Sequence, residues 1–291
     1  MYVNPAIGNT PIDQLTRPIV KNFLRSLINK LSRSSIETAK NCISGTCEFA
    51  IDDGLLLIGS NPAREAMKNI GVAKKSERKP VNVLTGEDVE LIIATTKQYR
   101  PDYYHLVLLA FRTGMRLGEI LALRWGNIDW QRSIILVEKS WRNLVLTDTK
   151  TGMSRHVDMS DQLVQELRNL LHQRKMEAVK KGLSQPIDII FHDKHGNHLS
   201  QNSVRNIWKR TLSKAGLLHN KFHITRHTFA SILLAANVPI SYVSKMMGHS
   251  SIQMTVDIYA HLMPDRDKSA INILDQSGNS VATTKDKSLA T

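Results

Sequence analysis

A polar, basic stretch of ten residues, GVAKKSERKP at positions 71–80, interrupts the apolar patterning of the chain. It lacks the apolar residues of a core, and its final proline disfavours a continuing helix, so it is typical of a linker. The 291 residues are long enough for two domains with ordinary cores. The sequence therefore predicts one domain over residues 1–75, a basic linker at 76–80, a second domain over 81–275 and a flexible tail at 276–291.

The first domain is expected to consist of helices. An amphipathic pattern with a proline in its first turn covers residues 17–31. The sequence SSIE predicts a capping box, in which Ser34 and Glu37 begin a second helix that ends near Gly54. The segment NPAREAMKNIG, residues 61–71, has the cap, the early proline and the final glycine of a third helix.

The second domain mixes helices with a few strands. The segment LTGED caps a helix, and the apolar helix DYYHLVLLAFRTG stops at Gly114. SIILVE and IDIIF have strand character, and LVLTDTKTGMSRHVDM reads as a hairpin of two short strands. Helices are expected at about 160–182, 200–214, 224–236 and 251–262. The predicted fold is mainly α: a small helical domain, then an α+β domain with a small antiparallel sheet.

Charge points to a polyanionic partner. The net charge is +13 and the isoelectric point is near 9.8. Residues 1–80 hold 12 Lys and Arg against 7 Asp and Glu, and the remainder hold 27 against 19. Such an excess in both parts favours binding to a phosphate backbone, although a basic enzyme with a small-molecule substrate has the same composition.

Cysteine content and hydropathy favour the cytoplasm of a prokaryote. Cys42 and Cys47 are the only cysteines and lie five positions apart in a predicted helix, which indicates reduced packing residues. The sequence shows no apolar run of membrane-spanning length and no signal peptide.

The segment HITRH carries three costly side chains within one and a half helical turns. His223 and Arg226 are three positions apart and so share a helix face, which alone is most often a solvated surface. His223 and His227 are spaced four apart, as zinc ligands can be, but no third ligand follows at a convincing spacing.

Tyr259 also has two interpretations when taken alone. It continues an apolar stripe with Ile252 and Val256, so it fits a core aromatic with its hydroxyl at the boundary. Upstream, Gly248 is expected to end a helix and a following serine to cap the next one, which places His249 in the turn just before the Tyr259 helix.

A third polar group lies in FRTGMRLGEILALRW. Arg116 follows the helix end at Gly114, and Glu119 comes three residues later. A guanidinium at such a turn is well placed to bind phosphate oxygens in a bidentate manner. The alternative is a surface ion pair, which the apolar flanks make less suitable because they should pack against a core.

Taken together, five segments resemble the motifs of tyrosine recombinases of the phage-integrase type. They are TGMRLGEILALRW, TKTGMSRHV, HITRHTFAS, MMGHSS and TVDIYAHL, in the order and spacing of that family. Residues 11–75 similarly resemble its helical core-binding domain, which has a SAM-like fold. By this resemblance the catalytic residues are Arg116, Lys150, His223, Arg226, His249 and the nucleophile Tyr259, with Glu119 in support.

The resemblance implies DNA cleavage through a 3′-phosphotyrosyl link, without a metal ion or any other cofactor. Two arginines would neutralise the transition state. His223 is the expected proton acceptor for Tyr259, and Lys150 the expected donor to the departing 5′ oxygen. Linker residues would contact the DNA backbone, namely Lys74, Lys75, Arg78 and Lys79.

The resemblance also implies partners. The family acts as a homotetramer on two paired duplexes with specific sites, at times with a DNA-bending protein and an excisionase. Residues 269–276, SAINILDQ, are expected to dock either on a neighbouring protomer or on their own domain. Residues 1–16 resemble the stretch that follows an arm-binding domain in many integrases, so the chain is either truncated or has an alternative start.

Two rival functions remain at this stage. A type IB topoisomerase shares the nucleophile chemistry but relaxes DNA, and a decayed integrase would grip DNA without cutting it. The compact chain with its separate helical domain favours recombination over relaxation. The joint presence of Tyr259, Lys150 and His249 argues against decay.

Overall fold

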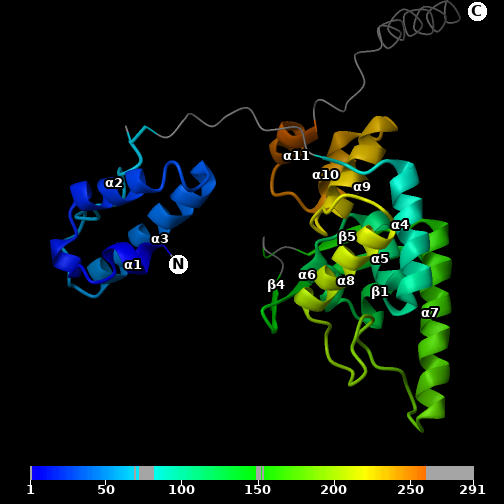
Figure 1. Ribbon diagram of the computed structural model, residues 1–291. Helices are drawn as coiled ribbons and strands as arrows, with labels where there is room; N and C mark the ends of the chain where they lie inside the picture. Colours follow the sequence, from blue (N-terminus) through cyan, green and yellow to red (C-terminus); the bar gives the residue numbers. More distant parts are fainter. Residues whose placement is uncertain (1, 69, 72–81, 149–151, 153, 260–291) are drawn as a thin grey trace, which may run out of the picture. The chain divides into compact units, whose positions relative to one another are not determined.

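The computed structural model describes residues 2–68, 70–71, 82–148, 152 and 154–259. The chain divides into two compact units, Met1–Lys79 and Pro80–Thr291 (Figure 1). The expected linker at residues 76–80 and the tail at 276–291 lie outside the described residues. Among the helices that are described, none combines the length and the apolar character that crossing a membrane requires.

The N-terminal unit contains α1 (Val3–Ile7), the 3₁₀ helix η1 (Ile12–Gln14), α2 (Arg17–Ser26) and α3 (Arg33–Asp52). Its core joins one face of α2 to one face of α3, where Phe23, Leu24, Ile36 and Cys47 are buried. Cys47 thus packs as expected, whereas Cys42 is exposed and does not.

Two local predictions in this unit are wrong. The cap of α3 is Ser32, whose hydroxyl accepts from the backbone N–H of Ser35, and Glu37 binds Arg33 instead of closing a capping box at Ser34. Residues 62–68 form turns with backbone bonds between residues three apart, and no α-helix is assigned there. The side-chain amide of Asn61 donates hydrogen bonds to Ser44 and Glu48 of α3, which fixes this segment against α3.

The C-terminal unit is built around a helical core. The helices α4 (Gly86–Tyr99), α5 (Pro101–Thr113), α6 (Leu117–Ala122) and α7 (Asp161–Lys180) come first. After the sheet region and a loop follow α8 (Gln201–Lys214), α9 (Ile224–Ala235), α10 (Ile240–Met247) and α11 (Ile252–Tyr259). The sequence patterns predicted most of these helices, but for α10 they predicted only its end at Gly248. Nine of the thirteen residues of α5 are buried.

The strands form two small antiparallel sheets. The 3₁₀ helix η2 (Trp125–Asn127) leads into β1 (Ile128–Asp129), which pairs with β2 (Ile134–Val137), and β2 pairs with β5 (Arg155–Asp158). Separately, β3 (Lys139–Arg142) pairs with β4 (Val145–Asp148).

The expected hairpin between β4 and β5 is therefore wrong in its pairing, although both segments are strands. The hairpin that does form turns at Asn143 and Leu144, both with positive φ, as a two-residue hairpin turn requires. The IDIIF segment forms only an isolated bridge, between Ile189 and Arg124, and is not a strand.

Two left-handed glycines fix the loops that meet at the site. Gly114 ends α5 at φ 61°, and a Cβ there would lie 2.4 Å from the Phe229 ring of α9. Gly248 ends α10 at φ 65°, and a Cβ there would lie 2.7 Å from Arg155. Both positions need glycine for its backbone conformation and for the close approach.

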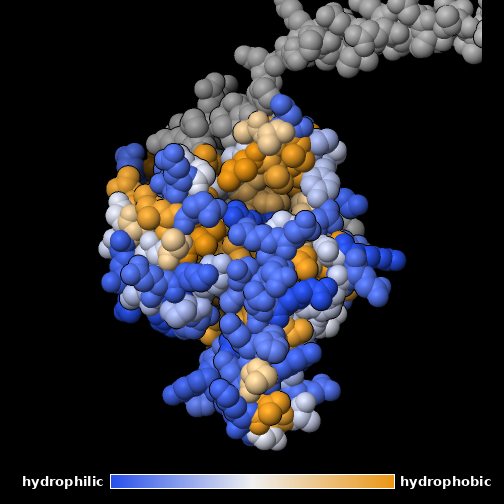
Figure 2. Space-filling view, turned by 90° about the vertical axis from the view of Figure 1, so that its right-hand side faces the viewer, coloured by the Kyte–Doolittle hydropathy of each residue, from blue (hydrophilic) through white to orange (hydrophobic). Residues whose placement is uncertain are grey.

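The outer face that carries α4 and α7 is mainly hydrophilic, with apolar side chains in separate patches (Figure 2). α7 explains this pattern, because it buries Leu163, Leu167, Leu170 and Ala178 and turns its charged residues outward. The polar residues considered below are different, since several of them are buried.

Candidate active site

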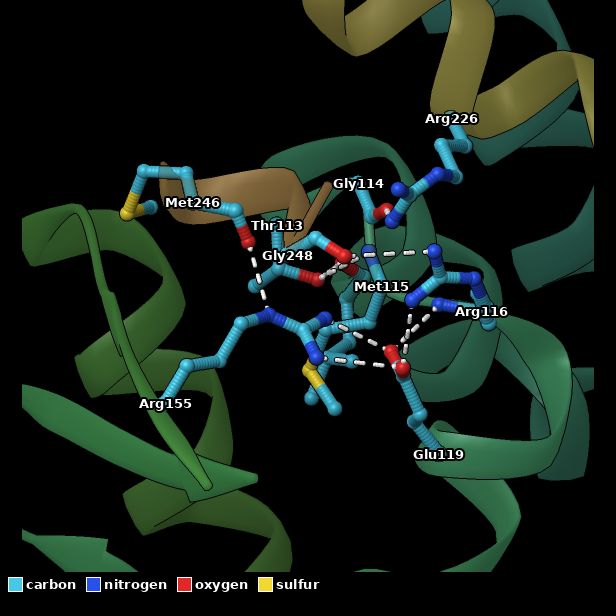
Figure 3. Close-up of polar contacts among 10 residues, drawn as sticks. Thr113, Gly114, Met115, Arg116, Glu119, Arg155, Arg226, Met246 and Gly248 are labelled. Atoms are coloured by element: carbon cyan, nitrogen blue, oxygen red, sulfur yellow. Dashed lines mark hydrogen bonds and ion pairs between the residues drawn. The ribbon is translucent and has the colours of Figure 1, made fainter. Parts of the chain in front are cut away.

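Glu119 is the centre of a buried ion-pair network. Its side chain is 2% exposed and is held by guanidinium groups from two elements (Figure 3). Arg155 of β5 donates two hydrogen bonds to it, at 3.1 and 2.7 Å. Arg116 donates two as well, one from its guanidinium at 3.0 Å and one from its backbone N–H at 2.9 Å. Burial alone would raise the pKa of Glu119, but Arg155 and Arg116 outweigh it and the pKa is lowered. Glu119 is therefore a fixed negative charge.

The same two arginines bind backbone carbonyls at the C-terminal end of α10. Nε of Arg155 donates to the backbone carbonyl of Met246 at 3.0 Å, and Nη2 of Arg116 donates to that of Gly248 at 3.3 Å. Figure 3 shows both contacts reaching across from the sheet and from α6. Because His249 directly follows Gly248 in the chain, the network also fixes the backbone position from which the His249 side chain extends.

Arg226, on α9, is buried with a donor to spare. Only 2% of the residue is exposed, and Nη1 donates to the Gly114 carbonyl at 2.9 Å. Its Nη2 is buried and has no hydrogen-bond partner among the residues that the structure describes. Burial and then Arg116 lower the pKa of Arg226 to about 9, so it stays charged at neutral pH. An unpaired buried donor costs about 1–3 kcal/mol, which an anion at this point would recover.

The two predicted histidines flank this cationic centre. Partial desolvation, followed by His227 and Arg226, lowers the pKa of His223 to about 4, although the residue as a whole is exposed. Burial, followed by Arg226 and Arg116, does the same for His249, whose Nδ1 lies 2.7 Å from the Thr255 hydroxyl. Both imidazoles are therefore neutral at pH 7 and can each donate one hydrogen bond to an anion.

Tyr259 ends α11 and is fully buried. Its hydroxyl lies 2.6 Å from Nδ1 of His227, not from His223. The expected pairing of His223 with Tyr259 is therefore wrong in this structure. Burial raises the pKa of Tyr259 to about 12, against the opposing charge of Arg226.

Beside this centre is an open cavity of about 750 Å³. Arg116 and His223 line it, together with further cations from β3, α8 and the segment before α9: Arg142, Arg205 and Lys221. Glu119 and Asp148 are also in the lining, so cations outnumber carboxylates around the cavity, and Arg116 is part of its wall.

The structure brings together six of the predicted site residues: Arg116, Glu119, His223, Arg226, His249 and Tyr259 are linked through shared partners and mutual electrostatic effects. Lys150 lies outside the described residues, as do Lys74, Lys75, Arg78 and Lys79. No group of three His, Cys, Asp or Glu side chains with metal-binding geometry occurs in the described part of the chain.

Two further residues escaped the sequence interpretation. Arg155 was part of the recognised TKTGMSRHV segment, yet its partner Glu119 is 36 positions away. His227 was considered only as a zinc ligand, and its partner Tyr259 is 32 positions away. The available signal was that each residue lies within a recognised motif. The motif did not indicate which distant residue would bind it.

Known proteins place this arrangement in a family. The model of the phage integrase family matches residues 82–266. A tyrosine recombinase XerC-like protein of Caldanaerobacter subterraneus subsp. tengcongensis is 27% identical over 295 residues, covering 92% of this chain and 74% of that protein. The ICEBs1 integrase of Bacillus subtilis is 26% identical over 288 residues, covering 94% and 74%.

Solved structures show the same fold. The Tn1549 transposon integrase in complex with transposon right end DNA is 20% identical, with a TM-score of 0.69 over 94% of this chain and 88% of that one. The mainly α fold with small antiparallel sheets, expected from the sequence, is thereby confirmed.

The family match extends over more than half of the chain, and the chain belongs to the phage integrase family. It is a tyrosine-type site-specific recombinase, of the enzyme class that cleaves and rejoins DNA.

Proposed function

We propose that this recombinase cuts DNA at specific sites through Tyr259, forms a 3′-phosphotyrosyl intermediate, and thereby integrates or excises a mobile element. One observation carries the proposal. Arg226 has a buried Nη2 without a hydrogen-bond partner among the described residues, and it interacts electrostatically with Arg116, His223, His249 and Tyr259. A scissile phosphate supplies the missing acceptor.

Arg116 and Arg226 are the groups that stabilise the transition state. When an oxygen attacks a phosphodiester, the added negative charge gathers on the non-bridging oxygens. Donors fixed in advance at those oxygens contribute about 3 kcal/mol each. Glu119 and Arg155 hold Arg116 in place, and the Gly114 carbonyl holds Arg226, so neither guanidinium has to reorganise during the reaction.

His249 donates a further hydrogen bond to the same oxygens, and Lys150 protonates the departing 5′ oxygen. The phosphotyrosyl link conserves the energy of the phosphodiester, so a second 5′ hydroxyl can reseal the strand without ATP. The arginine pair supplies the positive charge for these steps, and we assign no step to a metal ion.

The substrate is double-stranded DNA that carries specific recombination sites. The net charge of +13 supports this, as do Arg142, Arg205 and Lys221 around the cavity at Arg116. The Tn1549 integrase, which this fold resembles, is described in complex with DNA. In this proposal the linker residues contact the DNA backbone: Lys74, Lys75, Arg78 and Lys79.

The active assembly in this proposal is a homotetramer on two synapsed duplexes, assisted by a DNA-bending protein and an excisionase. It acts in the cytoplasm of a prokaryote, in association with the nucleoid. Relatives named as a probable prophage integrase and as the ICEBs1 integrase support the mobile-element role.

The test is capture of the covalent intermediate on a nicked suicide substrate. Tyr259→Phe is expected to bind DNA with unchanged affinity and to form no protein–DNA adduct. Tyr242→Phe is the matched control, because Tyr242 is a partly exposed tyrosine bonded to Asp158, and it should form the adduct normally. An adduct that persists in Tyr259→Phe and disappears in Tyr242→Phe would move the nucleophile to Tyr242.

A further inference from the structure

We propose that His227 accepts the proton of Tyr259 during strand cleavage, while His223 faces the phosphate instead. The inference rests on the proposed role of Tyr259 as the nucleophile. It assigns His227 a direct part in the reaction, since His227 contacts the reacting oxygen itself.

The geometry of the contact is that of a proton transfer pair. Nδ1 of His227 lies 2.6 Å from the Tyr259 oxygen, which is at the short end for a hydrogen bond. The rings are tilted by 52° with centroids 5.9 Å apart, so the pair is joined through the heteroatoms and not by stacking. With the ring proton on Nε2, Nδ1 is the acceptor and the phenol is the donor.

The resting protonation states are those from which this transfer starts. Burial, followed by the charge of Arg226, lowers the pKa of His227, so the imidazole is neutral and its Nδ1 lone pair is available. Burial raises the pKa of Tyr259 to about 12, so the phenol retains its proton until a base removes it. Among the described residues, the titratable groups against His227 are Tyr259 from α11 and His223 and Arg226 from α9.

His223 has different surroundings. It is the N-cap of α9, it is exposed, and it lines the open cavity together with Arg116. Its ring meets the His227 ring edge to face at 4.8 Å. The two imidazole rings thus contact each other, and each has a different neighbour on its other side. His223 lines the cavity, and His227 binds the buried phenol of Tyr259.

These groups account for each bond and each proton in the cleavage step. The Tyr259 oxygen forms a bond to phosphorus as the bond from phosphorus to the 5′ oxygen breaks. The phenolic proton passes to Nδ1 of His227, and the 5′ oxygen takes a proton from the acid assigned to Lys150. Rejoining runs in reverse: the imidazolium returns its proton to the departing Tyr259 oxygen.

The test is single-turnover cleavage at saturating suicide substrate, combined with a more acidic phenol. His227→Ala should bind DNA normally and cleave about 10²–10⁴-fold more slowly, the usual contribution of general acid–base catalysis. His227→Asn should remain slow as well, because its amide can hold the phenol but is not basic. A trifluorinated tyrosine at position 259 ionises without a base, so it should recover at least tenfold of the rate in either variant.

His223→Ala is the matched control, since it removes the adjacent imidazole from the same helix. The fluorinated tyrosine should give it no selective recovery. A full rate in His227→Asn, or recovery confined to His223→Ala, would overturn the proposal. Failure of the nucleophile assignment is separate, because it shows as an adduct in Tyr259→Phe with His227 intact. If His227→Ala does not fold, His227→Asn carries the test, because its amide keeps a hydrogen-bonding group near the position of Nδ1.

Discussion

Replacing Arg155 by alanine should destabilise the C-terminal unit by about 3 kcal/mol. The side chain of Arg155 is 10% exposed and makes two hydrogen bonds to Glu119 and one to the Met246 carbonyl. Removing one partner of a buried ion pair costs about 3–5 kcal/mol, because the other charge stays buried. Arg116 remains bonded to Glu119 in the variant, which places the expected loss at the lower end of that range.

Urea unfolding followed by tryptophan fluorescence measures this loss in the intact chain. All four tryptophans, at positions 125, 130, 141 and 208, belong to the C-terminal unit, so the signal reports that unit alone. With a urea dependence of about 3 kcal/mol per molar for a unit of this size, the midpoint should fall by about 1 M.

Arg124→Ala is the matched control for the loss of an arginine ion pair. Arg124 binds Asp188 at 3.0 Å, but the two side chains are 47% and 54% exposed. Exposed pairs contribute at most about 1 kcal/mol, so the midpoint should move by no more than about 0.3 M. Equal shifts in the two variants would refute the argument from burial, and an unchanged midpoint in Arg155→Ala would refute the role of the network.

Three further outcomes are expected. Gly248→Ala should unfold at lower urea than Gly216→Ala, because both glycines have positive φ but only at position 248 would a Cβ meet a side chain, that of Arg155 at 2.7 Å; equal midpoints would remove this steric argument. The pKa of Glu119 is lowered in the folded state, so its ionised carboxylate stabilises the C-terminal unit above the ordinary pKa of 4.5. This stabilisation is lost as the pH falls through the lower folded pKa. Acid titration of the tryptophan signal should show this loss in the unchanged protein and should not show it in Glu119→Gln. Lys150→Ala should cut an ordinary phosphodiester about 10²–10⁴-fold more slowly and a bridging 5′-phosphorothiolate at nearly the wild-type rate. Lys139 is paired with Asp148 at 2.8 Å, and Lys139→Ala should show no selective recovery on the sulfur substrate. Recovery in Lys139→Ala and none in Lys150→Ala would make Lys139 the acid.

Helix ends that depend on neighbouring residues were predictable from the sequence. Thr85 and Asp88 form the capping box that begins α4, and Gly114 and Gly248 end α5 and α10 in the left-handed conformation. Each of these signals involves residues within a few positions of one another. Where two serines near one helix start could act as the cap, the prediction chose the wrong one: Ser32 caps α3, and Ser34 already lies in its first turn.

Strand pairing was not predictable in the same way, because a strand's partner is set by contacts far along the chain. The segments of β4 and β5 alternate as strands should, but β2 offers β5 a buried position opposite Ile135 and Val137. The turn at Asn143 and Leu144 meanwhile closes β4 onto β3. The local pattern therefore gave the strands without giving the sheet.

A core aromatic residue and a nucleophile are alternative interpretations of Tyr259 in the sequence. The structure agrees with the core position and is compatible with the nucleophile. Tyr259 is fully buried, as a core aromatic would be, and its hydroxyl is bonded to His227. Burial raises the pKa of the phenol to about 12, so it is protonated at neutral pH. The apolar stripe that predicted a core residue and the motif that predicted a nucleophile thus describe the same side chain, because a buried phenol bonded to an imidazole fits both a core position and the role proposed for Tyr259.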